Sequence, residues 1–313
     1  MHIAVVALGG NAIIKRGEKG TIAEQFANTR QALSGIIDLI EAGYYIIITH
    51  GNGPQVGNAL IRVEEALVAG KAQDRPLGVC VADTEGGMGY MIEQSLQNKL
   101  YLNKIELPVV TILTQVVVDK NDPSIKNPTK PIGPFFTEEE AKIMESRGLQ
   151  VVEDCGRGWR RVVPSPMPLE IVERETIKKL VKQGTIVIAA GGGGMPVYIE
   201  EDGTFEGIDA VIDKDLASSA LAKDVSAELL LILTDVNEVS LNFGKPNQKA
   251  LRKITVREAK QYLEEGHFPS GSMGPKIQAG IKFIEDGGSE AIITSLECAG
   301  RAIKGEAGTH IVK

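Results

Sequence analysis

The sequence predicts an α/β protein, a three-layer αβα sandwich with a mainly parallel central sheet and a small protruding subdomain. Three observations predict this class. Short segments that are apolar at consecutive positions recur along the chain, helical segments lie between most of them, and one irregular segment interrupts the alternation. Continuous apolar runs indicate strands covered on both faces, which is typical of a parallel sheet between two layers of helices.

The predicted strands are rich in β-branched residues and leucine and lack the alternation of a half-exposed strand. Because helices connect strands of the same direction, the carboxyl ends of the strands meet at one edge of the sheet, where ligands of such sheets bind. The predicted strands are IAVVAL (residues 3–8), YYIIIT (44–49), VVTILT (109–114), TIVIAA (185–190), ELLLILT (228–234) and AIITS (291–295).

Three segments between these strands have apolar residues at helical spacing. They cover residues 22–43, 168–184 and 273–287, and each ends at a glycine. A glycine just after the last apolar position is a common end of a helix. We therefore expect three helices that pack on the sheet through right-handed crossovers.

Residues 119–168 interrupt this alternation with a segment dense in proline, glycine and charge. An irregular segment of this length inside a compact domain is usually a lid or a small subdomain, and otherwise a disordered insertion. Trp159 and the pair Phe135–Phe136 favour an ordered subdomain. We expect residues 1–313 to form a single domain that carries this protrusion.

Composition excludes several classes of protein. The chain has 313 residues and a net charge of −7, which disfavours binding to nucleic acid. Cys80, Cys155 and Cys298 are far apart and form no C-x-x-C pair, which suits a reducing compartment. No apolar run approaches the roughly 18 residues of a membrane helix, and the chain begins with a strand pattern rather than a leader. We expect a cytoplasmic protein without a membrane partner.

Glycine-rich or small polar turns follow four of the predicted strands. A single turn of this kind is a common tight connection, but four at one edge favour a site where backbone N–H groups and helix N-termini hold phosphate. The P-loop pattern and the protein-kinase motifs are absent from the sequence. The turns are Gly9-Gly10-Asn11, Gly51-Asn52-Gly53, Gly191 to Gly194, and Thr234-Asp235-Val236-Asn237.

The first of these turns follows a strand that ends without a cation, at Ala7 and Leu8. Three lysines elsewhere could supply the charge. Lys130 lies among prolines, whereas Lys214 and Lys276 lie at predicted helix starts, where a lysine opposes the helix dipole unless an anion is near. Alternatively, Lys214 pairs with a neighbouring aspartate, Lys276 is a surface residue and Lys130 lies on a mobile loop.

At these residues the chain resembles the carbamate kinases of the amino acid kinase fold family. The resemblance extends over residues 3–312, and the segments NPTKPIGPF and RRVVPSP are specific to carbamate kinases within the wider fold family. Relatives that phosphorylate amino acids carry lysine where this chain has Ala7, and the resemblance implies that Lys130 supplies that charge from the subdomain. The segments are ALGGNA, THGNGPQVG, KNDP, NPTKPIGPF, GRGWRRVVPSP, AAGGGG, VIDKDLA, ILTDV and EEGHFPSGSMGPK.

The resemblance implies reversible phosphoryl transfer, ATP plus carbamate giving ADP plus carbamoyl phosphate, run mostly toward ATP in arginine catabolism. It also implies a homodimer, and Mg²⁺ that is held by ATP oxygens and water rather than by a firm protein ligand. The alternatives are a carbamoyl phosphate-synthesising enzyme, and a nucleotide-binding sensor or storage protein on the same fold.

The resemblance also assigns residues to roles. Residues 1–190 would form the carbamate-binding half, with the lid at residues 119–168, and residues 191–313 the nucleotide-binding half. The expected catalytic residues are Lys130, Lys214, Lys276 and Asp215, the last of which could instead be a helix N-cap. The expected carbamate and phosphate contacts are Gly9, Gly10, Asn11, Gly51, Asn52 and Gly53. The expected nucleotide contacts are Gly191, Gly192, Asp213, Thr234, Asp235, Val236, Asn237, Met273 and Gly274.

A few further residues have open roles. Arg157, Arg160 and Arg161 could close over the phosphates or form salt bridges within the subdomain, and His50 is expected to orient the second glycine turn. Three positions depart from the pattern of relatives, which usually show Gln at Glu85, often an apolar residue at Asp83, and commonly Gly at Glu238.

Overall fold

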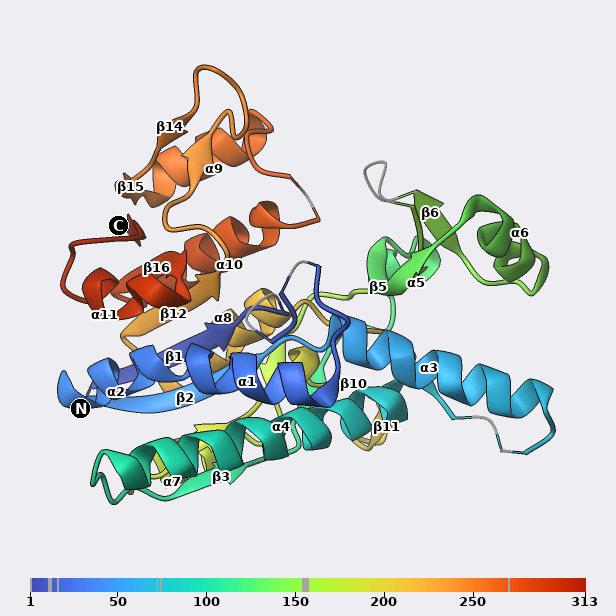
Figure 1. The fold of residues 1–313 in the computed structure, drawn as a ribbon, viewed down its shortest axis with the longest axis horizontal. Helices are drawn as coiled ribbons and strands as arrows, with labels where there is room; N and C mark the ends of the chain where they lie inside the picture. The colour runs from blue at the N-terminus through green and yellow to red at the C-terminus, as the bar shows by residue number, and fades with distance from the viewer. Residues whose placement is uncertain are drawn as a thin grey trace.

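A central sheet of eight strands forms the middle layer of the part of the chain that the structure describes (Figure 1). This computed structural model describes residues 2–10, 13–15, 17–71, 73, 75–153, 158–269 and 271–313. The strand order is β15-β17-β16-β12-β1-β2-β9-β3, and β17 is antiparallel to β16. The strands are β1 (His2–Leu8), β2 (Tyr44–His50), β3 (Val109–Thr111), β9 (Ile186–Ile188), β12 (Leu229–Thr234), β15 (Lys253–Thr255), β16 (Glu290–Ser295) and β17 (Thr309–Val312).

The register of the three middle strands brings their carboxyl ends to one level. Leu8 of β1 pairs with His50 of β2 and with Leu233 of β12. The chain then turns at once, and the Gly9 N–H donates to the Leu233 carbonyl at 3.0 Å while the Gly51 N–H donates to the Leu8 carbonyl at 3.2 Å. Two glycine turns therefore start side by side at the middle of the sheet edge.

Helices cover both faces of the sheet because successive strand residues point to opposite sides. In β1, Val5 and Ala7 pack on the side of α7, α8, α9 and α10, whereas Val6 and Leu8 pack on the side of α2, α4 and α11. The helices are α1 (Ile22–Ala32), α2 (Ser34–Glu41), α4 (Leu77–Leu102), α7 (Arg174–Lys182), α8 (Lys214–Val225), α9 (Val256–Glu264), α10 (Met273–Glu285) and α11 (Ala299–Ala302).

The predicted class is confirmed, but several predicted boundaries were wrong. Residues 22–43 form two helices that meet at Leu33, and the helix expected from residue 168 begins only at Arg174, since Glu170–Ile171 is strand β8. The predicted strand 109–114 ends at Thr111. The helix predicted at 273–287 matches α10 closely, whereas α4, with 26 residues, was missed.

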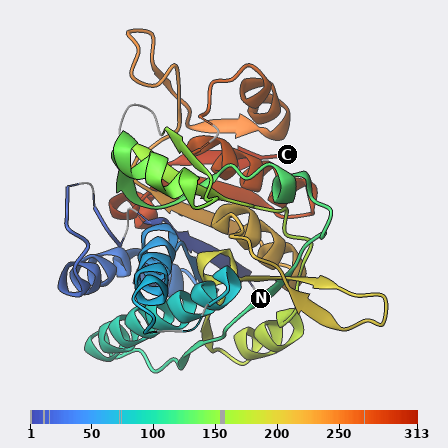
Figure 2. The same ribbon diagram turned by 90° about the vertical axis from the view of Figure 1, so that its right-hand side faces the viewer.

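Smaller elements flank the main sheet. A second sheet, in the order β11-β10-β4-β8, includes a hairpin that projects from the body and is drawn in yellow in Figure 2. No helix of the described residues is long and apolar enough to span a bilayer. The elements are β4 (Gln115–Val117), β8 (Glu170–Ile171), β10 (Met195–Ile199), β11 (Phe205–Gly207), β13 (Ser240–Leu241), β14 (Lys249–Ala250) and the 3-10 turns η2 (Gly191–Gly193) and η3 (Leu296–Cys298).

The irregular segment forms the predicted subdomain, which projects beside α3 (Gly53–Val68) and is drawn in green in Figure 1. A three-stranded antiparallel sheet, β5-β7-β6, carries α6 on it. Ile132 packs with Val56 and Leu60 of α3, and Arg161 pairs with Glu64. Cys155 and Arg157 lie outside the described residues. The elements are α5 (Pro123–Lys126), β5 (Lys130–Phe136), α6 (Glu138–Ser146), β6 (Val151–Glu153) and β7 (Trp159–Val163).

The subdomain meets α3 at a glycine pair, and this contact leads to a prediction. A Cβ atom on Gly57 would lie 1.9 Å from the Cα atom of Gly133, so Gly57→Ala must push β5 away from α3. We expect this variant to lose about 1–3 kcal/mol of unfolding free energy in urea denaturation. Gly87→Ala in α4 is the matched control, because a Cβ atom there meets nothing within 4 Å. It should be neutral or gain up to about 1 kcal/mol. Equal stability of the two variants would contradict the close packing.

Candidate active site

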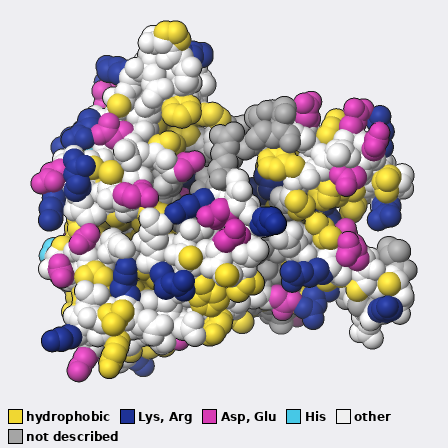
Figure 3. Space-filling view, in the orientation of Figure 1, with side chains coloured by type: hydrophobic (Ala, Val, Ile, Leu, Met, Phe, Trp, Pro, Cys, Tyr) yellow, Lys and Arg dark blue, Asp and Glu magenta, His cyan; other side chains and the backbone are white. Residues whose placement is uncertain are grey.

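A cavity of about 480 Å³ lies at the carboxyl ends of β1, β2 and β12. The strand ends supply its glycine turns, α8 and α10 contribute their N-terminal residues, and β5 brings Lys130 from the subdomain. In Figure 3 basic and acidic side chains lie side by side in the central hollow of this face. The first residues of α3, α8 and α10 all line the cavity, and helix N-termini favour anions.

Most of the predicted site residues line this cavity, although the roles assigned to them stay predictions. Asn11 lies outside the described residues. Gly191, Asn237 and Gly274 are not among the lining residues. The predicted residues that line the cavity are Gly9, Gly10, Gly51, Asn52, Gly53, Lys130, Gly192, Asp213, Lys214, Asp215, Thr234, Asp235, Val236, Met273 and Lys276.

The three residues that do not line the cavity make other contacts. The Gly191 N–H donates to Glu85 Oε1 at 2.9 Å, so this donor faces α4 instead of a ligand. The Gly274 N–H donates to the Pro269 carbonyl, and the Asn237 carbonyl accepts from Thr294 Oγ1 at 3.0 Å.

Asp215 joins two of the three lysines. It lies in the first turn of α8, is only 2% exposed, and accepts hydrogen bonds from the ammonium groups of Lys214 and Lys276, the latter at 2.9 Å. A carboxylate that accepts from two ammonium groups fixes both of them in place. Lys276 is therefore no surface residue, and Lys214 pairs with the aspartate that follows it.

Asp213 holds the third lysine and also caps α8. Its Oδ1 accepts from the N–H groups of Asp215 at 2.9 Å and Leu216 at 3.4 Å, and its Oδ2 accepts from Lys130. The N-cap of α8 is therefore Asp213, and the alternative that Asp215 caps the helix was wrong. Lys130 is the first residue of strand β5, so it does not lie on an irregular loop.

Burial and mutual charge set the protonation of this cluster. For Asp215, burial alone would raise the pKa, but the charges of Lys214 and Lys276 lower it well below the ordinary value. Burial lowers the pKa of Lys214, and the nearby Lys276 adds to that effect. Burial also opposes the charge of Lys276, but Asp215 outweighs it and raises the pKa of Lys276. Asp215 thus supports the charge of each lysine, whereas the two lysines oppose each other's charge.

Glycine is required where the backbone approaches these groups. A Cβ atom on Gly51 would lie 3.1 Å from Lys214 Cδ, and one on Gly192 would lie 2.2 Å from Asn52 Nδ2. Gly192 also has a φ of +68°, which favours glycine. A side chain is therefore excluded at Gly192, and at Gly51 it would press against Lys214.

Ala7 is fully buried between the sheet and its helix layer, so β1 offers no cation to the first turn. The positive charge near Gly10 and Gly51 comes from Lys214, which contacts Gly51. Lys130 and Lys276 line the same cavity. Lysines from three separate segments thus line the cavity beside a strand that carries none.

Other residues with open roles contact neighbours outside the cavity or at its edge. His50 is fully buried, its Nδ1 lies 3.4 Å from the Gly51 carbonyl, and burial lowers its pKa to about 4. Arg160 donates to the Gly133 carbonyl at 3.0 Å within the subdomain. Glu238 lines the cavity and pairs with Arg252, and Asp83 of α4 pairs with Arg75, which precedes that helix.

Part of the cavity wall was not predicted. It is mainly apolar. Many of its residues lie in segments that carry the resemblance, such as EEGHFPSGSMGPK, but hydrophobicity gave no signal to separate them from core residues. An apolar wall of this kind suits a flat aromatic base. The unpredicted lining residues are Ile132, Val211, Ile212, Glu238, Val239, Ser240, Phe243, His267, Phe268, Pro269, Gly271, Ser272 and Pro275.

This arrangement can bind anions and neutralise their charge. Ammonium groups, backbone N–H groups and helix N-termini converge on one cavity, and such groups stabilise a transferring phosphoryl group. His50 is neutral because burial lowers its pKa to about 4, and its Nδ1 lies 3.4 Å from a backbone carbonyl, so the geometry does not favour a role in proton transfer.

Comparisons with known proteins agree with this geometry. Residues 2–295 match the model of the amino acid kinase family. The carbamate kinase of Thermococcus kodakarensis is 52% identical over 315 residues and covers 100% of both chains. The carbamate kinase of Pyrococcus furiosus is 52% identical over 98% of each chain.

Solved structures with this fold include carbamate kinase from Giardia lamblia. In complex with citric acid it superimposes with a TM-score of 0.94 at 44% identity, covering 100% of this chain and 98% of that one. The form bound to AMP-PNP gives a TM-score of 0.90 over the same shares of the two chains.

The buried carboxylate of Asp215 leads to a prediction. Asp215→Asn leaves Lys214 and Lys276 without their shared counter-charge, so we expect a loss of about 3–5 kcal/mol of unfolding free energy at neutral pH. Glu138→Gln is the control, because Glu138 forms an exposed ion pair with Lys142 and should change stability by less than about 0.5 kcal/mol. Urea denaturation would measure both. A loss in Asp215→Asn no larger than in the control would contradict the proposed coupling.

Proposed function

Because the chain belongs to the amino acid kinase family and resembles its carbamate kinases over its full length, we propose that it catalyses reversible phosphoryl transfer between ATP and carbamate. The reaction is ATP plus carbamate giving ADP plus carbamoyl phosphate. One structural observation carries the proposal: Lys130 reaches from the subdomain into the glycine-lined cavity that already holds Lys214 and Lys276.

The chemistry of carbamate suits a site built from cations. Carbamate is already an oxyanion and needs no general base to attack the γ-phosphorus. The protein must instead align two anions and neutralise charge on the transferring group. In this proposal Lys130 and Lys214 flank the transferring phosphoryl group, Lys276 lies nearer the β- and γ-phosphates, and Asp215 orients the lysines.

The substrates divide between the two halves of the cavity. The N–H groups of Gly9, Gly10 and Gly51 would hold carbamate and the phosphoryl group, with Asn52 beside them. The turn after β12 and the apolar wall with Phe243 would surround the adenosine. Residues 1–190 would thus bind mainly carbamate, and residues 191–313 mainly the nucleotide.

Mg²⁺ would enter with the nucleotide. Among the described residues, no group of three or more His, Cys, Asp or Glu side chains is placed to hold a metal ion. The two carboxylates next to the lysines, Asp213 and Asp215, are already paired with ammonium groups. Mg²⁺ usually keeps its water and binds through phosphate oxygens in such sites, so we propose that the nucleotide supplies most of its ligands.

Further features of the proposal come from the resemblance. We propose that the protein is a cytoplasmic homodimer and that it works mainly toward ATP, in arginine catabolism. The alternative direction, synthesis of carbamoyl phosphate, would use the same groups. A sensor or storage protein would not need Lys130 in the cavity beside Lys214 and Lys276, which favours the enzyme.

The subdomain lysine leads to a prediction for turnover. Lys130→Ala should lower kcat by at least about a hundredfold, because it removes a cation from the transferring group, whereas ADP affinity should change little. Lys126→Ala in the same subdomain is the control and should keep activity, since Lys126 does not line the cavity. Stopped-flow kinetics and calorimetry with ADP would separate the two effects. Full activity in Lys130→Ala would reject the role of this lysine.

The proposed reaction is tested by an assay for ATP from ADP and carbamoyl phosphate. The assay would be compared with phosphoryl transfer from ATP to acetylglutamate, aspartate and uridylate. We expect rapid formation of ATP and at most trace transfer to the other three acceptors. A faster reaction with any of them, or nucleotide binding without turnover, would overturn the proposal.

A further inference from the structure

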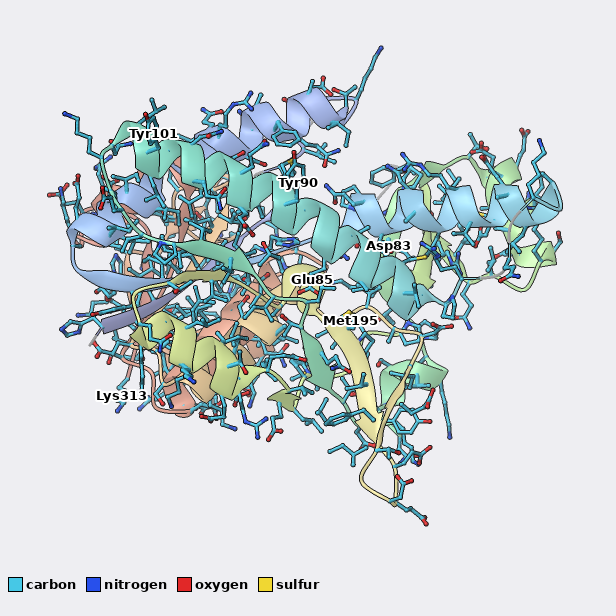
Figure 4. The ribbon with its side chains drawn as sticks, turned by 90° about the horizontal axis from the view of Figure 1, so that it is seen from below. Asp83, Glu85, Tyr90, Tyr101, Met195 and Lys313 are labelled. Atoms are coloured by element: carbon cyan, nitrogen blue, oxygen red, sulfur yellow. The ribbon has the colours of Figure 1, made fainter. Side chains whose placement is uncertain are left out.

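Glu85 is a buried carboxyl group next to the phosphate side of the cavity. It lies in α4 and is only 1% exposed. Its Oε1 accepts from the Gly191 N–H at 2.9 Å and its Oε2 from the Thr114 N–H at 3.3 Å. Figure 4 shows Glu85 where α4 passes close to the yellow turn that follows β9. The side chain thus connects α4 to backbone at the ends of β9 and β3.

The neighbouring residue of α4 connects to a second glycine turn. Thr84 Oγ1 accepts from Asn52 Nδ2 at 3.0 Å. Asn52 lines the cavity, as does Gly192, the residue after Gly191. Two adjacent residues of α4 therefore fix the two turns that would hold phosphate and carbamate.

Among the residues that the structure describes, no positively charged side chain pairs with Glu85. His50 faces it from the end of β2, because a Cβ atom on Gly191 would meet both His50 Nε2 at 2.2 Å and Glu85 Cγ at 2.9 Å. Glu173 is the nearest like charge and already accepts from Gln115. On α4 itself Asp83 is half exposed and pairs with Arg75.

We infer that Glu85 is a positioning residue that carries a proton while the protein works, and that its neutral carboxyl group anchors the turn at Gly191 without placing a negative charge behind the anion cavity. This inference rests on the proposed function for its effect on turnover. A neutral carboxyl group keeps its carbonyl oxygen as the acceptor of the Gly191 N–H at 2.9 Å, and its hydroxyl oxygen accepts more weakly from the Thr114 N–H at 3.3 Å.

The balance of charge in the cavity shows why the proton matters. The lysine cluster has three ammonium groups, on Lys130, Lys214 and Lys276, and two carboxylates, on Asp213 and Asp215. Asp235 also lines the cavity, so the lining has no excess of positive charge to spare. An ionised Glu85 would add a further negative charge in a region of low dielectric. Anionic substrates would then lose much of their attraction to the cavity.

The environment of Glu85 agrees with a bound proton. Burial raises its pKa to about 8, although the N–H groups of Thr114 and Gly191 act in the opposite direction. Because the pKa is raised on folding, the neutral form contributes stability that is fully present below about pH 4.5 and is lost as the pH rises through about 8. Ionisation of Glu85 thus lowers the stability of the fold as well as the positive electrostatic potential of the cavity.

The variant Glu85→Gln tests this inference, because glutamine, like a neutral carboxyl group, has one carbonyl oxygen to accept from the Gly191 N–H and one donor position, and it cannot ionise. Activity is measured with ADP and carbamoyl phosphate, as the ratio of kcat/KM in Glu85→Gln to that in the unmodified protein. We expect a ratio within about twofold of 1 near pH 6.5 and a rise to about tenfold near pH 9, one unit above the pKa. Asp83→Asn, which neutralises an exposed carboxylate in the same helix, is the control and should show a flat ratio.

Denaturation gives a second readout that does not depend on the reaction. Between about pH 5 and 8 the unfolding equilibrium constant of the unmodified protein should rise about tenfold per pH unit relative to that of Glu85→Gln. A flat difference would show that Glu85 is already ionised and would overturn the inference. A stability difference that changes with pH, together with an activity ratio that does not, would overturn the positioning role.

If the unmodified protein makes no ATP, the proposed function and the positioning role both fail. Denaturation would still show whether Glu85 carries a proton in the folded protein.

Discussion

Two carboxylates at the start of α8 hold together the parts of the chain that form the cavity. Asp213 and Asp215 together accept from Lys130, Lys214 and Lys276. Buried ammonium groups are costly unless they are paired, so these lysines must converge where the aspartates stand. The pairing therefore fixes the subdomain strand β5, the first turn of α8 and the first turn of α10 relative to the sheet edge. The glycine turns need no charged side chains of their own, because the lysines of other segments supply the positive charge.

The same pairing makes the cluster responsive to an anion. The oxygens of an incoming phosphate compete with the two aspartates for hydrogen bonds from the ammonium groups. The bound phosphate also lowers the free-energy cost of the excess positive charge that the cluster buries. Lys130 differs from the other two because its partner Asp213 is the N-cap of α8 and its own strand belongs to the subdomain. Packing of Ile132 and Gly133 on α3 keeps the subdomain close enough for this contact.

Sequence patterns predicted the layers of the fold, because continuous apolar runs are local signals, and the positions of Lys214 and Lys276 at helix N-termini marked them as anion ligands. The expectation that Lys130 joins them from the subdomain came from the resemblance. Sequence patterns did not predict α4, whose glycines at positions 78, 86, 87 and 89 weaken helical periodicity and of which Gly89 packs closely against Thr111. They also placed Glu170–Ile171 in a helix, since a two-residue strand depends on pairing with distant β4. The contact of Gly191 with Glu85 and the apolar wall depend on tertiary contacts that spacing alone does not encode. The choice of Asp213 over Asp215 as the N-cap depends on the residue at which α8 begins, and helix boundaries are poorly defined by sequence patterns.

The central claim is that these three lysines neutralise a phosphoryl group held at the glycine turns. A crystal structure with MgADP, carbamate and aluminium fluoride, a mimic of the transferring phosphoryl group, tests it most directly. The account predicts that the fluoride ligands contact the ammonium groups of Lys130 and Lys214 between Gly9 and Gly51, with Lys276 at the β-phosphate. A mimic bound elsewhere, with Lys130 still paired to Asp213, would contradict it.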